Sequence, residues 1–205
     1  MSKKLQILSQ GLFLVLFAVL VVTGRVQLWM GIFLLSVLLA LFLGRFYCGW
    51  VCPINTAMRA VTGAKKRLKI KNFRMPGFFK NPAFRYGFLV IFIGTFSFVM
   101  ATGTKLPVLP ALFFLGIGLT LFFPENLWHR YLCPYGTILT LTGSRAKKGM
   151  LIDSDNCTLC GVCREACPSD AVNENEKEGY TIEKGLCLTC LDCAVECPNG
   201  SIHFN

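Results

Sequence analysis

Acidic residues and histidine are scarce in this chain of 205 residues. Charged residues make up only 16% of it, it has two histidines, and Glu125 is the only acid among residues 1–150. Hydrophobic residues reach 54%, with a mean hydropathy of +0.55. This composition excludes a disordered tail, a coiled coil and a nucleic-acid-binding arm. We therefore expect no nucleic-acid partner.

Several cofactor motifs are also missing. The sequence has no Gly-x-Gly-x-x-Gly fingerprint, no phosphate-binding lysine loop and no Cys-x-x-Cys-His attachment site for c-type haem. Its apolar stretches contain no pair of histidines that could ligate haem b. We therefore expect the chain to supply redox wiring rather than substrate chemistry, and to work as a subunit rather than as a stand-alone enzyme.

Charge divides the chain into two unlike parts. Residues 1–150 hold 18 Lys and Arg against one acid, whereas residues 151–205 hold three Lys and Arg against ten acids. The net charge of +10 is thus the sum of a basic, apolar part and a small, acidic, cysteine-rich part. We predict a membrane domain at residues 1–149 and a soluble domain at residues 150–205.

Four apolar stretches predict transmembrane helices. Each is 16 to 18 residues long and free of charged side chains, at the short end of the ~17–25 residues that cross a bilayer. No small-x-small cleavage site follows the first stretch, so we expect it to be retained rather than removed as a signal peptide. The four stretches are Leu5–Val22, Val26–Leu43, Tyr86–Ala101 and Leu106–Phe123.

The positions of Lys and Arg predict the orientation in the membrane. Of the 18 in residues 1–150, 16 lie outside the two short turns that join the apolar stretches in pairs. By the positive-inside rule, both termini, the long middle loop and the acidic domain are cytoplasmic, and the chain belongs to the inner membrane. We expect Trp29, Trp50 and Trp128 to anchor it at the membrane interfaces.

A basic run occupies the middle loop. Lys65–Lys71 contains five Lys and Arg with no acid nearby. We expect it to face anionic lipid headgroups, with docking to the acidic domain or to an acidic partner as the alternatives.

Eight cysteines form a repeated motif in the acidic part. Cys157-x2-Cys160-x2-Cys163-x3-Cys167-Pro168 recurs 30 residues later as Cys187-x2-Cys190-x2-Cys193-x3-Cys197-Pro198. Three closely spaced thiolates hold three corners of a 4Fe-4S cluster, and the Cys-Pro of the opposite repeat supplies the fourth. Structural zinc uses more widely separated pairs, and disulfides do not suit the cytoplasm. The predicted ligands are Cys157, Cys160, Cys163 and Cys197 for cluster I, and Cys187, Cys190, Cys193 and Cys167 for cluster II.

This part resembles the bacterial two-cluster ferredoxins, a small α+β fold. The resemblance covers about 50 residues, and all eight ligands are present. A domain this small is stabilised by its clusters as much as by burial. We expect Asn173–Gly179 to be a surface turn, and a small core of Ile152, Val172, Ile182 and Ile202.

The other three cysteines indicate a tandem repeat in the membrane part. Cys52-Pro53 follows the second apolar stretch, Cys133-Pro134 follows the fourth, and the two are 81 residues apart. At the same offset Cys48 corresponds to His129. The predicted membrane fold is therefore an all-α four-helix bundle made of two tandem helix pairs, each followed by one motif.

The spacing of these motifs predicts a further site. Residues i and i+4 share a helix face, so two motifs meeting at a pseudo-twofold axis would bring Cys48, Cys52, His129 and Cys133 together. Such a set could hold a third iron–sulfur cluster or a metal ion. The alternative is that the cysteines are small apolar residues at helix ends and that His129 lies on the surface.

Glu125, four residues before His129, has three readings. It could orient His129, it could accept a proton from a quinol, or it could be a solvated acid among the headgroups. Tyr47, Trp50 and Tyr131 could flank a quinone ring or act as interfacial anchors.

Taken together, these motifs resemble the NapH-type membrane iron–sulfur proteins. The resemblance implies a quinol-dehydrogenase-like subunit that relays electrons between the quinone pool or a partner subunit and a soluble or peripheral carrier. The second membrane motif departs from the family's usual Cys-x3-Cys-Pro, because it begins with His129. The alternative functions are a redox assembly factor for a metalloenzyme and a membrane redox sensor.

Overall fold

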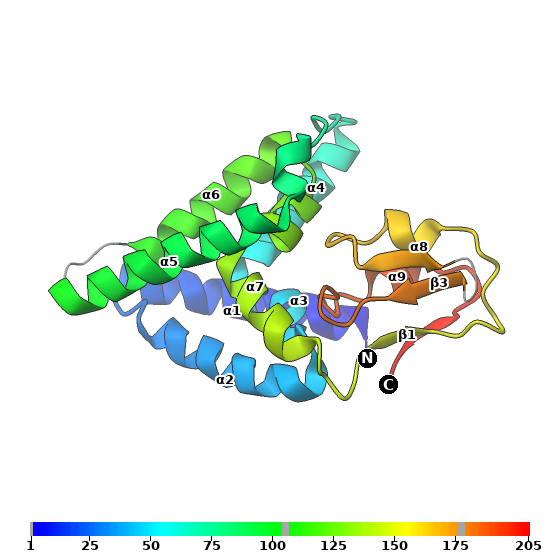
Figure 1. Ribbon diagram of the computed structural model, residues 1–205, viewed down its shortest axis with the longest axis horizontal. Coiled ribbons are helices and arrows are strands. Elements are labelled where there is room, and N and C mark those ends of the chain that lie inside the picture. The colour runs from blue at the N-terminus through cyan, green and yellow to red at the C-terminus, as the bar shows by residue number, and fades with distance from the viewer. Residues whose placement is uncertain (1, 104–106, 176–178) are drawn as a thin grey trace.

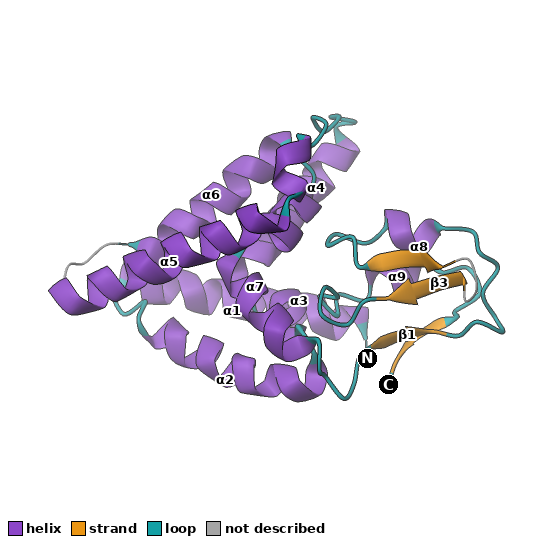
Figure 2. Ribbon diagram, in the orientation of Figure 1, coloured by secondary structure: helices purple, strands orange, loops and turns teal. Residues whose placement is uncertain are grey.

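The computed structural model describes residues 2–103, 107–175 and 179–205. The start of the fourth apolar stretch at Leu106 and part of the predicted Asn173–Gly179 turn lie outside these residues. Helices make up the N-terminal part, and the described strands lie in the C-terminal unit (Figures 1 and 2). The N-terminus lies next to this unit.

The four apolar stretches form helices. They are α1 (Lys3–Val22), α2 (Leu28–Leu43), α5 (Pro82–Thr102) and α6 (Val108–Phe122). The turn between α1 and α2 lies at the end of the molecule away from the C-terminal unit, as do the end of α5 and the start of α6 (Figure 1). Among the described residues, α1 alone is both long and apolar enough to cross a membrane, while the apolar helical segments Leu28–Leu43, Ala83–Val99 and Val108–Phe122 are shorter.

A short motif and a second helix follow each apolar pair. α3 (Phe46–Trp50) leads into α4 (Pro53–Arg67), with the 3-10 turn η1 (Gly77–Lys80) before α5. In the second half the π-helix η2 (Leu127–Leu132) leads into α7 (Pro134–Gly143). Apart from η1, the two halves therefore contain corresponding elements in the same order: two apolar helices, a short helical motif and a further helix.

The two Cys-Pro motifs have the same backbone geometry. The N–H of Cys52 donates to the carbonyl of Tyr47 at 2.9 Å, and the N–H of Cys133 donates to that of Trp128 at 2.8 Å. Both are wide i to i+5 turns, typical of π-bulges at functional sites. Each cysteine then caps a helix whose first residue is proline, a favoured start because proline lacks an N–H.

The two halves exchange helices. α4 packs against α6 of the other half as well as against α1, and α7 packs against α2 of the other half as well as against α5. This is a pseudo-twofold arrangement in which each helix that follows a motif completes the core of the opposite half.

Aromatic rings fill the space between the helix pairs. Trp29 contacts Phe17 edge-on, and Phe33 packs against both Tyr47 and Tyr135. Trp29 is only 1% exposed and donates its N–H to the Tyr47 hydroxyl at 2.8 Å.

The expectation that the tryptophans are interfacial anchors is wrong. Trp29, Trp50 and Trp128 are all buried. Trp50 donates its N–H to the carbonyl of Thr189 at 3.0 Å. Because protein acceptors satisfy the indole N–H groups of Trp29 and Trp50, these rings pack inside the molecule rather than reaching for water.

The C-terminal unit contains two small antiparallel sheets. β1 (Met150–Ile152) pairs with β4 (Ile202–Phe204), and β2 (Val172–Asn175) pairs with β3 (Gly179–Ile182). The short helices α8 (Val162–Glu165) and α9 (Asp192–Glu196) follow the cysteine loops. The expected core residues face one another, Ile152 opposite Ile202 and Val172 opposite Ile182. Val172 and Ile202 are buried, and the other two are partly buried.

The C-terminal unit sits directly on α3. A Cβ at Gly49 would overlap the carbonyl oxygen of Leu188, so the two backbones touch at a position that only glycine allows. Gln6 and Gln10, one turn apart on α1, both donate to the carbonyl of Gly49, at 2.8 and 2.7 Å. The polar side chains of an otherwise apolar helix thus hold α3 in place.

Ion pairs surround this contact. Lys3 and Arg59 both contact the Asp192 carboxylate at 2.6 Å, and Arg130 contacts that of Asp170 at 3.1 Å. Among the described residues, the basic residues that pair with the acidic unit are Lys3, Arg59 and Arg130 of the helical part, and none belongs to the Lys65–Lys71 run. Lys65 itself is buried and donates to the carbonyl of Thr120 near the end of α6.

We predict that Gly49→Ala weakens the docking of the C-terminal unit. The added methyl group must push apart two backbones, which costs about 1–3 kcal/mol in a packed site. Limited proteolysis after α7 should become faster and the unfolding temperature should fall. Gly63→Ala, which adds a methyl group in open space on α4, is the matched control. Equal behaviour of the two variants would contradict the prediction.

Candidate iron–sulfur sites

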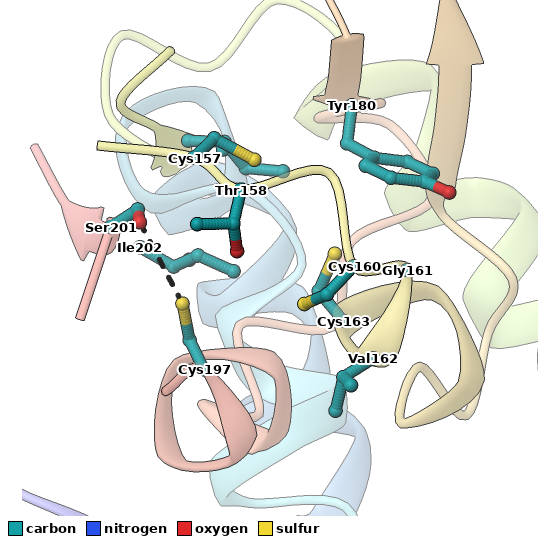
Figure 3. A pocket seen from close by; sticks show the side chains of 11 residues that line it. Cys157, Thr158, Cys160, Gly161, Val162, Cys163, Tyr180, Cys197, Ser201 and Ile202 are labelled. Atoms are coloured by element: carbon teal, nitrogen blue, oxygen red, sulfur yellow. Dashed lines mark hydrogen bonds between the residues drawn. The ribbon is translucent and has the colours of Figure 1, made fainter. Parts of the chain in front are cut away.

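One cavity in the C-terminal unit brings together the four cysteines predicted to hold cluster I. Cys157, Cys160 and Cys163 lie on the first cysteine loop, and Cys197 approaches from the end of the second repeat (Figure 3). Ile152, Tyr180 and Ile202 complete the wall. Three thiols from one loop and a fourth from elsewhere match the ligand set of a bacterial 4Fe-4S cluster.

The two cysteine loops share an unusual backbone. Leu159 and Thr189 occupy equivalent positions and have φ of 57° and 54°, and Leu191 has φ of 61° opposite Gly161. Left-handed conformations in bulky residues are strained and tend to cluster at functional sites. Here they curl each loop around its thiols, as a cluster-binding loop requires.

Backbone N–H groups point at the sulfur atoms. Thr189 donates to Cys187 Sγ at 3.4 Å, and Ala171 donates to Cys167 Sγ at 3.3 Å. At Cys197, burial acts to raise the thiol pKa, but hydrogen bonds from residues 199–201 outweigh it and the net pKa is lowered. These N–H groups would stabilise negative charge on ligating thiolates.

The cysteines predicted for cluster II also influence one another. The pKa of Cys187 is raised to about 11, because burial and nearby Cys167 raise it more than the Thr189 N–H and Arg45 lower it. Burial raises that of Cys193 to about 12, with contributions from Cys187 and Cys167. Cys167 of the first repeat is therefore near enough to Cys187 and Cys193 to raise their pKa values, and Cys163 also raises that of Cys193. The second cysteine loop, which contains Cys187, also contains Leu188 and Thr189, and these two residues contact α3.

The other three cysteines, those of the predicted membrane part, form a third group. Burial raises the pKa of the Cys52 thiol, and Cys48 and Cys133 raise it further. Burial likewise raises the pKa of Cys133 to about 12, with Cys48 as the largest charged neighbour. Gly136 N–H, in the first turn of α7, donates to Cys133 Sγ at 3.3 Å. A helix N-terminus favours a thiolate, and so this group is suited to a cationic metal centre.

His129 and Glu125 lie in a different environment from the one expected. His129 is 4% exposed, and its pKa is lowered to about 3 by burial, then by Arg45 and Arg59. Its Nε2 atom has no hydrogen-bond partner among the described residues. The ligand role of His129 stays a prediction.

Glu125 is 8% exposed, so the reading as a solvated acid is wrong. Burial raises its pKa, while a hydrogen bond from Thr62 and the charge of Arg59 lower it. The larger electrostatic contributions come from α4 and Asp192 rather than from His129. The bulge at η2 alters the regular i, i+4 relation on which the predicted pairing with His129 relied.

Within the described residues, no group of three or more His, Cys, Asp and Glu side chains is close enough to hold a single metal ion. All eleven cysteines are free thiols.

Sequence reasoning missed two features of these sites. Thr56 and Thr137, each four residues after a motif cysteine, donate back to the cysteine carbonyl at 3.1 and 3.0 Å. Their 81-residue offset is visible in the sequence and could have strengthened the repeat. Arg45, which approaches Cys48, carries no such signal, because arginine at a membrane surface normally faces solvent or lipid.

Comparison with known proteins supports 4Fe-4S binding. A 4Fe-4S binding domain family matches residues 26–71 and 106–150, and a second family of that description matches residues 150–173. The ferredoxin-type protein NapH of Haemophilus influenzae is 26% identical over 144 residues, covering 62% of this chain and 49% of its own. The Escherichia coli protein YccM, named for electron transport, is 23% identical over 162 residues, covering 65% and 44%. The chain is a NapH-like 4Fe-4S protein.

A further relative of this NapH-like protein is archaeal. An uncharacterised protein of Methanocaldococcus jannaschii is 26% identical over 147 residues, covering 66% of this chain and 56% of its own. The chain spans about half the length of the curated relatives it matches. The first family matches twice, and each matched segment contains one Cys-Pro motif, in agreement with the structural repeat.

We predict that paired substitutions reveal the interleaved ligands of this NapH-like protein. Cys157→Ala with Cys197→Ala removes two ligands of one cluster, so the chain should lose about four iron atoms. Cys157→Ala with Cys167→Ala removes one ligand from each cluster, so it should lose about eight. Iron and acid-labile sulfide counted per chain provide the measurement. The reverse pattern would mean that each motif holds its own cluster.

Proposed function

We propose that the chain is a membrane-anchored electron-transfer subunit. The observation that carries the proposal is the seating of the cluster II loop on α3, beside Cys48. Three sets of cysteines thus follow one another through the molecule: the membrane-part cysteines, the cluster II cysteines and the cluster I cysteines. When bound, 4Fe-4S clusters at these positions supply one-electron redox chemistry.

Exposed apolar side chains support anchoring through four helices. The outward faces of α1, α2, α5 and α6 carry large apolar residues that are more than half exposed, among them Leu12, Leu38, Val90 and Phe114. Soluble monomers rarely expose patches of this kind. Lipid provides an apolar environment for these faces, and each helix satisfies its own backbone hydrogen bonds. The distribution of Lys and Arg supports a cytoplasmic position for both termini and the acidic unit.

The outermost site faces the solvent. Cys160 is exposed, and so is Leu159 beside it. Residues 151–205 carry ten acids, which would attract a basic redox partner and speed its encounter. We propose that a soluble or peripheral electron carrier docks at the cluster I end, and that the quinone pool or a partner subunit exchanges electrons at the membrane end.

The chain's own residues hold and insulate the inner sites. Tyr47 and Tyr135 are buried beside the membrane-part thiols, and their rings pack on Phe33. Burial of this kind excludes water from the thiols. We propose that Cys48, Cys52 and Cys133, with His129 as the candidate fourth ligand, hold a third cluster.

Iron counts test the third site. We expect about twelve iron atoms per chain in anaerobically purified wild type and about eight in Cys52→Ala or Cys133→Ala. The two clusters of the C-terminal unit should stay bound in both variants, because neither Cys52 nor Cys133 belongs to that unit. Ser36→Ala on α2, away from all cysteine motifs, is the control. About eight iron atoms in every one of these proteins would mean that the membrane motifs bind no cluster.

Quinone re-oxidation tests the electron route. The dithionite-reduced protein in detergent should be re-oxidised by a water-soluble quinone analogue, and Cys52→Ala should slow this re-oxidation at least tenfold. The absorbance of the clusters reports the reaction. Clusters that stay reduced with every quinone but pass electrons to a copper ion would instead favour a role in metalloenzyme assembly.

A further inference from the structure

Arg45 is a buried cation without a carboxylate partner. Its side chain is 0% exposed. Within the part of the chain that the structure describes, every recorded ion pair uses another basic residue, namely Lys3, Arg59, Arg130 or Arg164. Burying an unpaired charge is costly, and proteins normally avoid it or supply an opposite charge. The buried Arg45 guanidinium therefore requires a negatively charged partner other than the side-chain carboxylates that the structure describes.

The contacts of the guanidinium point to the nature of that anion. One terminal nitrogen lies 3.8 Å from Cys48 Sγ and 3.3 Å from the carbonyl of His129. The other lies 3.4 Å from the carbonyl of Leu186, the residue before Cys187 of cluster II. Nε has no partner. The guanidinium thus lies between the membrane-part cysteines and the first ligand of the C-terminal unit's inner site.

Its charge reaches thiols on both sides. Burial is the largest influence on Cys133 and on Cys187 and raises both pKa values, but Arg45 lowers each of them. These two cysteines belong to different predicted clusters. A single positive charge therefore stabilises negative charge in both places.

The backbone around Arg45 is shaped to admit the guanidinium. Gly44, with φ of 64°, turns the chain at the end of α2 so that Arg45 enters the interior. A Cβ at Gly136 would overlap a terminal nitrogen of Arg45, so this position in α7 also leaves room for it. Two glycines from different halves of the repeat thus accommodate one side chain.

We propose that Arg45 is the shared counter-charge of two neighbouring iron–sulfur sites, the Cys48/Cys52/Cys133 site and the cluster II site, and that it raises the reduction potential of both. This inference rests on the proposed function, because it takes clusters to bind at these cysteines. Thiolate-ligated clusters are anionic, and reduction adds a further negative charge. A fixed positive charge in a low-dielectric interior favours the reduced form.

Reduction potentials test the proposal directly. With Arg45→Gln, at unchanged iron content, the reduced-to-oxidised ratio of the adjacent clusters at a fixed ambient potential should fall about tenfold, equivalent to about 59 mV for a one-electron couple. Arg45→Lys keeps the charge and should shift the ratio less. Arg67→Gln, which removes an exposed charge from the end of α4, is the matched control and should match wild type. Electron paramagnetic resonance during a redox titration provides the measurement.

A second variant keeps the test decisive if Arg45→Gln does not bind iron. Gly136→Ala retains the positive charge but displaces the guanidinium, and should lower the potential of the same clusters, whereas Gly63→Ala should not. If Arg45→Gln binds its full iron content and shows wild-type potentials, the proposed role of Arg45 is overturned. If Arg45→Gln binds no iron, wild-type potentials in Gly136→Ala overturn it. If wild type itself holds only about eight iron atoms, the proposed third cluster fails, and Arg45 is then judged on the cluster II signal alone.

Discussion

The close approach of two backbones at Gly49 and Leu188 governs the arrangement of all the thiol groups. Only a residue without a side chain allows the cluster II loop to rest on α3, and α3 contains Cys48. Gln6 and Gln10 hold the same peptide unit from α1. The ion pairs of Lys3, Arg59 and Arg130 then draw the acidic unit onto the basic helices. Without this contact the cysteines of the C-terminal unit and those of the helical part would lie in two independent units of one chain.

Burial and charge act against each other throughout these sites. Thiols gain no stability from ionising in an apolar interior, and burial raises the pKa of Cys52, Cys133, Cys187 and Cys193. Backbone N–H groups at the helix starts and in the curled loops oppose that effect, as does Arg45. Burial thus favours the protonated form of these four thiols until a cationic metal centre replaces the protons.

The sequence predicted the elements that depend on local pattern. The four apolar runs became helices, and the four residues predicted to form the small core face one another in the sheets, Ile152 opposite Ile202 and Val172 opposite Ile182. What it could not predict depends on tertiary burial. Trp29 is buried and not at the predicted membrane interface, because the Tyr47 hydroxyl accepts its N–H. Glu125 is buried because α4 supplies Thr62 and Arg59 as partners. The bulge at η2 is invisible in residue spacing, so an ideal i, i+4 face was the wrong geometry for His129 and Glu125.

The exchange of α4 and α7 between the two halves has an evolutionary consequence. Each half resembles one subunit of a twofold-symmetric dimer, in which identical surfaces meet across the axis. An ancestor with a single copy of the repeat would have assembled as a homodimer and presented two cysteines from each subunit. Once duplication and fusion joined the subunits, either motif was free to diverge alone. His129, at the position equivalent to Cys48, is a change in one motif only. A true homodimer cannot have such a difference, because both sides of its axis have the same sequence.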